Sequence, residues 1–157
     1  MPLIQVVNQS RTKIRPAAIK NTAKRTLNAL GYTESELSVL IVDDGEMTRL
    51  NDTYRQIGHT TDVLSFPMLE GEFAGIAPEM LGDVVISAQT AQTMSLETGT
   101  EFESVLDLLL IHGILHLLGI DHEAGPAEAK EMKIKTAELL EMLGHGGEEF
   151  GWFFDTD

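Results

Sequence analysis

The chain has 157 residues, a formal net charge of −14 and no cysteine. A chain of this length is expected to form one domain over 1–157 with a sizeable core. The lack of cysteine excludes disulfides and thiolate metal sites, so a bound metal needs histidine or carboxylate ligands. Residues 1–10 lack the pattern of a signal peptide, and no apolar run approaches transmembrane length. We therefore expect a soluble cytoplasmic protein with no membrane partner.

The basic residues are concentrated near the start of the chain. Residues 1–30 hold six of the eleven basic residues and none of the 25 acidic ones. The net charge opposes non-specific nucleic-acid binding, but a basic patch on an acidic body can still bind a polyanion locally. A solvated helix face would explain the same residues, and the sequence leaves both interpretations open. The six residues are Arg11, Lys13, Arg15, Lys20, Lys24 and Arg25.

The first part of the chain predicts two strands with a helix between them. Residues 3–7 and 36–42 are short, apolar and rich in β-branched side chains, which is typical of strands. Apolar residues recur at helical spacing over 16–30, and a proline suits the first position of that helix. Lys20 and Lys24 lie together on the side of the helix that is expected to be exposed.

The next segments predict a helix, a loop and a third strand. Turn-forming residues precede an expected helix over 45–54, and residues 55–60 are expected to form a loop. Residues 62–66 have the composition of a short strand that ends at a proline. The stretch 68–80 is rich in glycine and glutamate without periodicity, which predicts a surface loop.

The second half of the chain predicts one strand followed by three helices. Ser87 can cap the helix that follows the strand, and the pair Thr100 and Glu103 has the pattern of a capping box. Gly144 can end the last helix, after which the tail 144–157 is acidic and aromatic and is expected to pack on the surface or to be flexible. The expected elements are a strand over 81–87 and helices over 88–98, 101–118 and 126–143.

These elements predict an α/β (α+β) fold. Four short strands alternate with about five helices, so we expect a small mixed four-stranded sheet with helices around it. The helix over 101–118 is apolar on nearly all sides, as expected for a central buried helix.

Three of the five histidines lie within eleven residues, beginning in that central helix. His112 and His116 are four residues apart and therefore share one face of a helix. Gly119 can adopt the positive φ that ends a helix, so the chain can turn and bring His122 back toward them. This is the metzincin spacing, H-x-x-x-H-x-x-G-x-x-H. We predict one zinc ion held by His112, His116 and His122, with the fourth position open for water as in catalytic sites.

The histidines also admit other roles. A single histidine on an apolar helix is usually a core residue with satisfied hydrogen bonds, but three grouped imidazoles are better explained by a shared metal. His145 lies in a glycine-rich segment and is predicted to be solvated. Asp121 could orient a ligand, and we favour the alternative that it stabilises the turn after the helix.

The residue after the first histidine is Gly113, where metzincins have a glutamate that acts as general base. This absence disfavours a peptidase, because phosphodiester cleavage depends more on metal polarisation and charge stabilisation. Arg55 is the best candidate for phosphate binding, since a guanidinium pairs with phosphate bidentately, although a surface ion pair is the commoner role of an arginine. His59 could contact a phosphate or lie exposed.

Four sequence blocks resemble the YbeY family of bacterial zinc-dependent endoribonucleases and rRNA maturation factors. The resemblance covers about residues 35–143, and the histidine block is its most specific part. The blocks are MTRLNDTYR over 47–55, TDVLSFP over 61–67, LGDVVIS over 81–87 and HGILHLLGIDH over 112–122.

The resemblance implies an activity, a site and partners. It implies that the three histidines are catalytic zinc ligands and that Arg55 acts in the active-site cleft. The substrate would be single-stranded RNA, with a role in 16S rRNA 3′-end maturation on the small subunit and in ribosome quality control. From the residues themselves, the basic Lys20 and Lys24 and the loop residue His59 are the expected RNA contacts. Thr60 and Ile120 depart from the usual family residues, proline and an aromatic.

Two alternatives to this activity remain open from the sequence. One is a zinc peptidase-like hydrolase, which the metzincin spacing supports and Gly113 opposes. The other is a non-catalytic ribosome-assembly factor with a structural metal, which an open fourth coordination position opposes.

Overall fold

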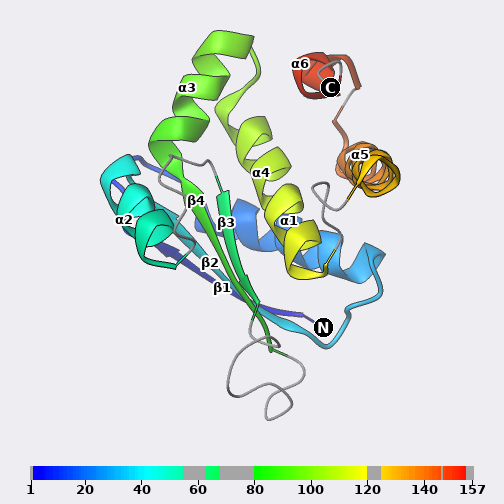
Figure 1. Cartoon of the computed structure of the whole chain (residues 1–157), viewed down its shortest axis with the longest axis horizontal. Helices are drawn as coiled ribbons and strands as arrows, with labels where there is room; N and C mark the ends of the chain where they lie inside the picture. Colours follow the sequence, from blue (N-terminus) through cyan, green and yellow to red (C-terminus); the bar gives the residue numbers. More distant parts are fainter. Residues whose placement is uncertain (1, 55–62, 68–79, 120–124, 146, 155–157) are drawn as a thin grey trace.

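The computed structural model describes residues 2–54, 63–67, 80–119, 125–145 and 147–154. In these residues four strands form one sheet in the order β1-β2-β4-β3 (Figure 1). Strands β1, β2 and β4 run parallel, and β3 is antiparallel to β4 at the sheet edge. The strands are β1 (Leu3–Asn8), β2 (Glu36–Val42), β3 (Val63–Pro67) and β4 (Met80–Ser87). The helices are α1 (Pro16–Ala29), α2 (Asp44–Tyr54), α3 (Ala88–Thr98), α4 (Phe102–Leu117), α5 (Pro126–Met142) and α6 (Gly151–Phe154), with a 3-10 helix η3 (Gly147–Phe150).

The predicted α/β class is confirmed. The predicted strands and helices that precede residue 144 match the observed ones to within one residue at each end. The loop predicted over 68–80 lies outside the described residues, apart from Met80, which begins β4. The two short helices η3 and α6 lie in the tail and were not predicted. The aromatic residues of the tail show no clear helical periodicity. None of the described helices is long and apolar enough to span a membrane.

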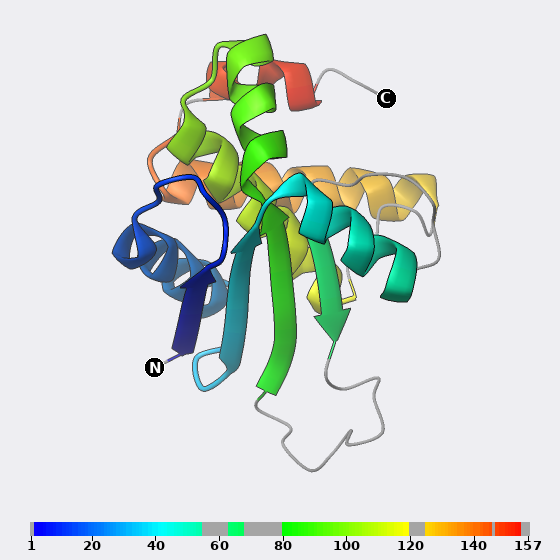
Figure 2. The ribbon, with the colours of Figure 1, turned by 90° about the vertical axis from the view of Figure 1, so that its left-hand side faces the viewer.

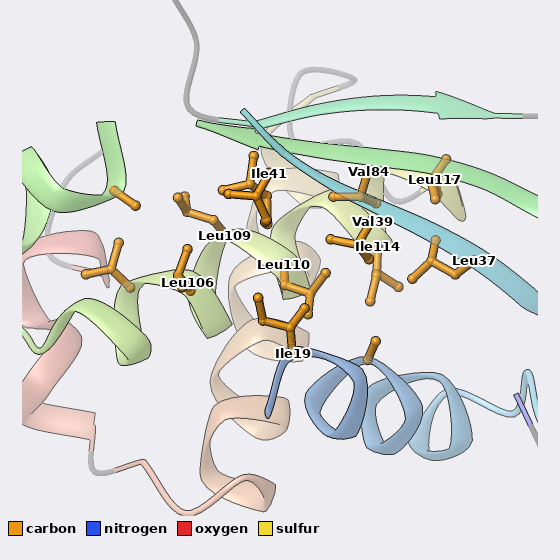
Figure 3. Packing of buried hydrophobic residues seen from close by; sticks show 14 of the residues in the cluster. Ile19, Leu37, Val39, Ile41, Val84, Leu106, Leu109, Leu110, Ile114 and Leu117 are labelled. Carbon is orange, nitrogen blue, oxygen red and sulfur yellow. The ribbon is translucent and has the colours of Figure 1, made fainter. Parts of the chain in front are cut away.

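Helix α4 lies between the sheet and the C-terminal helices (Figure 1). One side packs with α1 against β2 and β4, where alternate side chains of the two strands point toward the helices (Figure 3). The other side packs against α5 and the buried Phe150. A helix covered on both sides must be apolar nearly all round, which explains its composition. The residues on the sheet side are Val105, Leu106, Leu109, Leu110, Ile114 and Leu117, and those on the other are Leu108, Ile111 and Leu115.

Helix α2 covers the opposite face of the sheet (Figure 2). Its buried Met47 packs against Val42 and Val85, which alternate with the strand residues that face α4. The sheet therefore carries helices on both faces. Alternate side chains of β2 and β4 point to opposite faces, so both faces of these strands are apolar where α2 and α4 cover them.

The predicted helix ends at Ser87, Gly119 and Gly144 are confirmed, and one predicted cap is wrong. The Ser87 hydroxyl accepts from Thr90 N at 3.2 Å and caps α3, and Gly119 has the positive φ, 85°, that follows α4. The capping box at Thr100 does not form: Glu101 is the N-cap of α4, without a side-chain cap. The Thr100 hydroxyl instead donates to the carbonyl of Glu149 at 3.0 Å, since the C-terminal residues pack against it.

Candidate metal centre

Helix α4 presents His112 and His116 side by side. Their Nε2 atoms are 3.1 Å apart and their ring centroids 4.6 Å apart, and both side chains are half-buried. Two nitrogens bound tetrahedrally at about 2.0–2.1 Å from one zinc ion are separated by about 3.3 Å. The observed separation is close to that value. The pair therefore fits two positions of one tetrahedral ion, and a hydrogen bond between neutral rings is the alternative for the same geometry.

The remaining predicted site residues lie in parts of the chain that are not described. These are His122 and Asp121 after α4, and Arg55 and His59 between α2 and β3. Within the described ranges, no group of three or more potential ligands gathers around one point. The third zinc ligand and the phosphate-binding arginine therefore stay predictions. For the third ligand, the described geometry contributes only the end of α4 at Leu117 and the positive φ of Gly119, three residues before His122.

Gly113 lies on the side of α4 that faces the sheet. A Cβ added at Gly113 would lie 2.6 Å from Val84 Cγ1 and 3.0 Å from Val63 Cγ2. Both distances are at or below the limit for real Cβ contacts, and both partners are β-branched side chains with few alternative rotamers. The sequence suggested a missing general base at this position. The structure adds a second reason for glycine, namely that any side chain there would collide with β3 and β4.

Ser65 in β3 binds α4 at Gly113, the residue that packs against the sheet. Its hydroxyl donates to the carbonyl oxygen of Gly113 at 2.7 Å. Ser65 pairs with Val84 in the antiparallel β3–β4 register, so the hydroxyl meets Gly113 beside the valine whose side chain approaches that glycine most closely. No sequence pattern points to Ser65 as a residue that positions the helix. The only available signal was one hydroxyl within an otherwise apolar strand.

His145 is held by two carboxylates, so its predicted solvated state is wrong. Its Nε2 lies 2.8 Å from Asp107 Oδ2, its Nδ1 lies 3.5 Å from Glu149 Oε2, and its side chain is only 16% exposed. The hydroxyl of Thr22 in α1 donates to Asp107 Oδ1 at 2.9 Å. Asp107 thus joins α1, α4 and the C-terminal residues. Sequence patterns could not predict these contacts, because Thr22 and His145 lie 85 and 38 residues away from Asp107 in the chain.

Burial raises the pKa of the Asp107 carboxyl above its ordinary value. The hydrogen bonds from His145 and Thr22 and the charge of His145 act in the opposite direction, while the nearby Glu103 adds to the rise. The folded chain therefore holds this proton more tightly than the unfolded chain does. The stability from this group is complete below the ordinary value of 3.8 and is lost as the pH rises through the raised pKa.

We expect Asp107→Asn to remove this pH dependence while keeping an acceptor for Thr22. The variant should gain stability relative to the wild type as the pH rises above the ordinary pKa, because the amide has no charge to desolvate. Urea unfolding of both proteins at several pH values between about 4 and 7 measures the difference. A difference in the free energy of unfolding that stays constant or changes in the other direction would contradict the assignment.

The predicted RNA contacts Lys20 and Lys24 lie on α1, and their role in RNA binding stays a prediction. Helix α1 packs on α4 through Ile19 and Leu110 and through the bond of Thr22 to Asp107 (Figure 3). At about 100° per residue, this side of α4 is nearly opposite His116. Three other basic residues have intramolecular partners: Arg11 pairs with Asp43, Arg15 with Glu103, and Arg25 donates to the carbonyl of Met142.

Comparison with known proteins identifies the family. A family model described as "Endoribonuclease YbeY" matches residues 5–144. Relatives carrying the same description include one from Geobacter metallireducens, 46% identical over 140 residues, which are 88% of this chain and 93% of that protein. Another, from Aquifex aeolicus, is 47% identical over 138 residues, covering 88% of this chain and 90% of that one.

A solved structure supports the fold. The solution structure of a protein from Thermotoga maritima matches with a TM-score of 0.61 and 24% identity, covering 98% of this chain and 93% of the other. At this identity the likeness concerns the fold alone. The family model and the curated relatives, which match most of the chain, show that the protein belongs to the YbeY endoribonuclease family.

Proposed function

We propose that this protein is a zinc-dependent endoribonuclease that cleaves single-stranded RNA. Membership of an endoribonuclease family supports a hydrolase acting on RNA phosphodiester bonds. The single observation of the site that carries the proposal is the facing Nε2 atoms of His112 and His116 at 3.1 Å, a spacing suited to one tetrahedral ion. The metzincin-like arrangement is completed in this proposal by His122.

Each residue has a distinct task in the proposed reaction. His112, His116 and His122 hold the metal, which when bound supplies Lewis-acid polarisation and an acidified water. Arg55 neutralises charge that develops on the phosphate, for which a guanidinium fork is well suited. Ser65 and Gly113 would hold α4 against β3 and β4, which fixes the position of the helix face that carries His112 and His116.

The substrate and setting extend the same proposal. The RNA would be the 3′ region of small-subunit rRNA, handled on the ribosome in the cytoplasm during maturation and quality control. His59 would contact the RNA near the metal. Lys20 and Lys24, on α1, would bind backbone phosphates of the same RNA strand.

The position of Gly113 argues against the peptidase alternative. A glutamate there would have to fit against Val84 and Val63, where even a methyl group is too close. A general base of the metzincin type is therefore sterically excluded at this position, in addition to being absent from the sequence.

The test is chelator-sensitive cleavage of single-stranded RNA by purified protein and by Arg55→Glu. We expect the variant to retain its metal and to lose about 10²–10³-fold in kcat, the loss typical of removing one charge-stabilising group. Arg49→Glu is the matched control, because Arg49 is an exposed arginine that pairs with Glu46 in α2 at 2.6 Å. It makes the same charge change six residues earlier in the chain and should cleave RNA normally.

Two results would contradict the proposal. Undiminished cleavage by Arg55→Glu would remove that arginine from the mechanism. Cleavage of a peptide but not of RNA would replace the proposed substrate class.

A further inference from the structure

The C-terminal residues wrap around α4 and end against the candidate metal ligand. We name residues 145 and 147–154 the C-terminal brace. Successive residues of a helix are about 100° apart, so Asp107, Ile111, Leu108 and His112 follow one another around α4. The brace contacts both ends of this series, with His145 on Asp107 and Phe153 on His112, and Phe150 packs in the cluster that holds Ile111 and Leu108 between them.

The first attachment begins where α5 ends. Gly144 has a φ of 95°, and His145 N donates to the carbonyl of Leu140 at 2.9 Å, which is the bonding of a Schellman motif. The motif turns the chain toward α4, where the His145 ring lies between the carboxylates of Asp107 and Glu149. The start of the brace is thus fixed by backbone and side chain together.

The middle of the brace is held by the burial of Phe150 and by hydrogen bonds of Trp152 and Glu149 to the Thr100 hydroxyl. Phe150 is fully buried among Leu108, Ile111 and Leu115 of α4 and the apolar side of α5. The Trp152 indole donates to Thr100 Oγ1 at 2.8 Å, and the Thr100 hydroxyl donates to the carbonyl of Glu149 at 3.0 Å. The buried Phe150 ring and this pair of hydrogen bonds together anchor the middle of the brace on α4 and Thr100.

The end of the brace contacts the candidate site. The ring centroids of Phe153 and His112 are 6.2 Å apart with an interplanar angle of 88°, an edge-to-face arrangement. Phe153 in turn packs against Trp152 at 6.3 Å, and Trp152 against Phe150 at 6.4 Å. A continuous series of aromatic contacts therefore connects the buried anchor of the brace to the imidazole of His112.

We propose that Phe153 is a positioning residue that holds the His112 imidazole in its metal-binding orientation, with the C-terminal brace as its support. The proposal rests on the metal site of the proposed function. An imidazole ordered in advance loses less rotational freedom when it becomes a ligand, so the metal binds more tightly. The family model ends at residue 144, so the brace lies beyond the part of the chain that the model matches.

The test measures zinc affinity of the full-length chain by competition with a chromophoric chelator. Phe153→Ala should weaken zinc binding by about three- to tenfold, the range expected for one aromatic pair. Phe153→Tyr keeps the ring and should restore the affinity. Leu143→Ala is the matched control, because Leu143 packs against the same apolar cluster as Phe153. It should lose stability but not zinc affinity.

RNA kinetics at saturating zinc provide a second readout. A positioning role predicts a lower kcat for Phe153→Ala with an unchanged KM for RNA, whereas a residue that stacks on RNA would raise KM. Unchanged zinc affinity, equal losses in Phe153→Ala and Leu143→Ala, or an effect on KM alone would each overturn the proposal. If the wild-type protein itself binds no zinc, the proposed function fails, and that result is distinct from all of these.

Discussion

Replacing His116 by alanine is expected to abolish retention of zinc by the purified protein. His116 would supply one of three protein ligands, and its Nε2 lies 3.1 Å from that of His112. Changes to groups that merely orient a ligand cost about 10–100-fold in metal affinity, so removal of the ligand itself should cost at least about 100-fold. Metal analysis should give about one equivalent for the wild type and none for the variant. RNA cleavage should fall to the level of the chelator-treated wild type.

The control for this prediction is Glu103→Ala on the same helix. Glu103 is exposed and pairs with Arg15 at 3.4 Å, so its loss changes α4 without touching the histidines. Circular dichroism of His116→Ala should show that the helices remain, since one half-buried imidazole contributes little to the core. Full metal content and activity in His116→Ala would exclude this histidine as a ligand.

Replacing Gly113 by alanine should destabilise the protein by about 1–3 kcal/mol, the usual cost of overfilling a packed core. By helix propensity alone the change would stabilise α4 by about 1 kcal/mol. The sign is decided by the packing, because the new methyl carbon would lie 2.6 Å from Val84 Cγ1. Relief requires α4 to move away from β4, which also strains the 2.7 Å bond of Ser65 to the Gly113 carbonyl. Urea unfolding measures the loss.

Gly45→Ala is the matched control for Gly113→Ala. Gly45 also lies in a helix, and a Cβ added there meets nothing within 4 Å. It should be neutral or stabilising by up to about 1 kcal/mol. The double variant Gly113→Ala with Val84→Ala provides a second check, because shortening Val84 removes the overlapping carbon. The two changes should then cost less together than the sum of their separate costs. Additive costs would show that the predicted overlap does not exist.

These two positions show how differently sequence and structure treat neighbouring residues. The four-residue spacing of His112 and His116 was enough to place them on one face, because helix geometry is a local property. Gly113 looked like a catalytic position with its base missing. Only the packing of α4 on β3 and β4 shows that the position faces away from solvent and admits no side chain.

Other errors and omissions have the same origin. Thr100 has a good local capping pattern, but its hydroxyl is engaged by the carbonyl of Glu149 and the indole of Trp152, about 50 residues later. His145 looked solvated because its neighbours are glycines, whereas its partner Asp107 lies 38 residues earlier. Such side-chain partners are not encoded in any short window, so periodicity and composition cannot predict them.

The sequence by itself determined the α/β class, the bounds of the strands and helices before residue 144 and the family, since each depends on local periodicity or on residue patterns. The tertiary structure decided what surrounds α4. It placed Gly113 against the sheet, Asp107 between Thr22 and His145, and the edge of Phe153 on His112. The physical reason is that a central helix is packed from all sides by segments distant in sequence, and close packing selects which side chains meet.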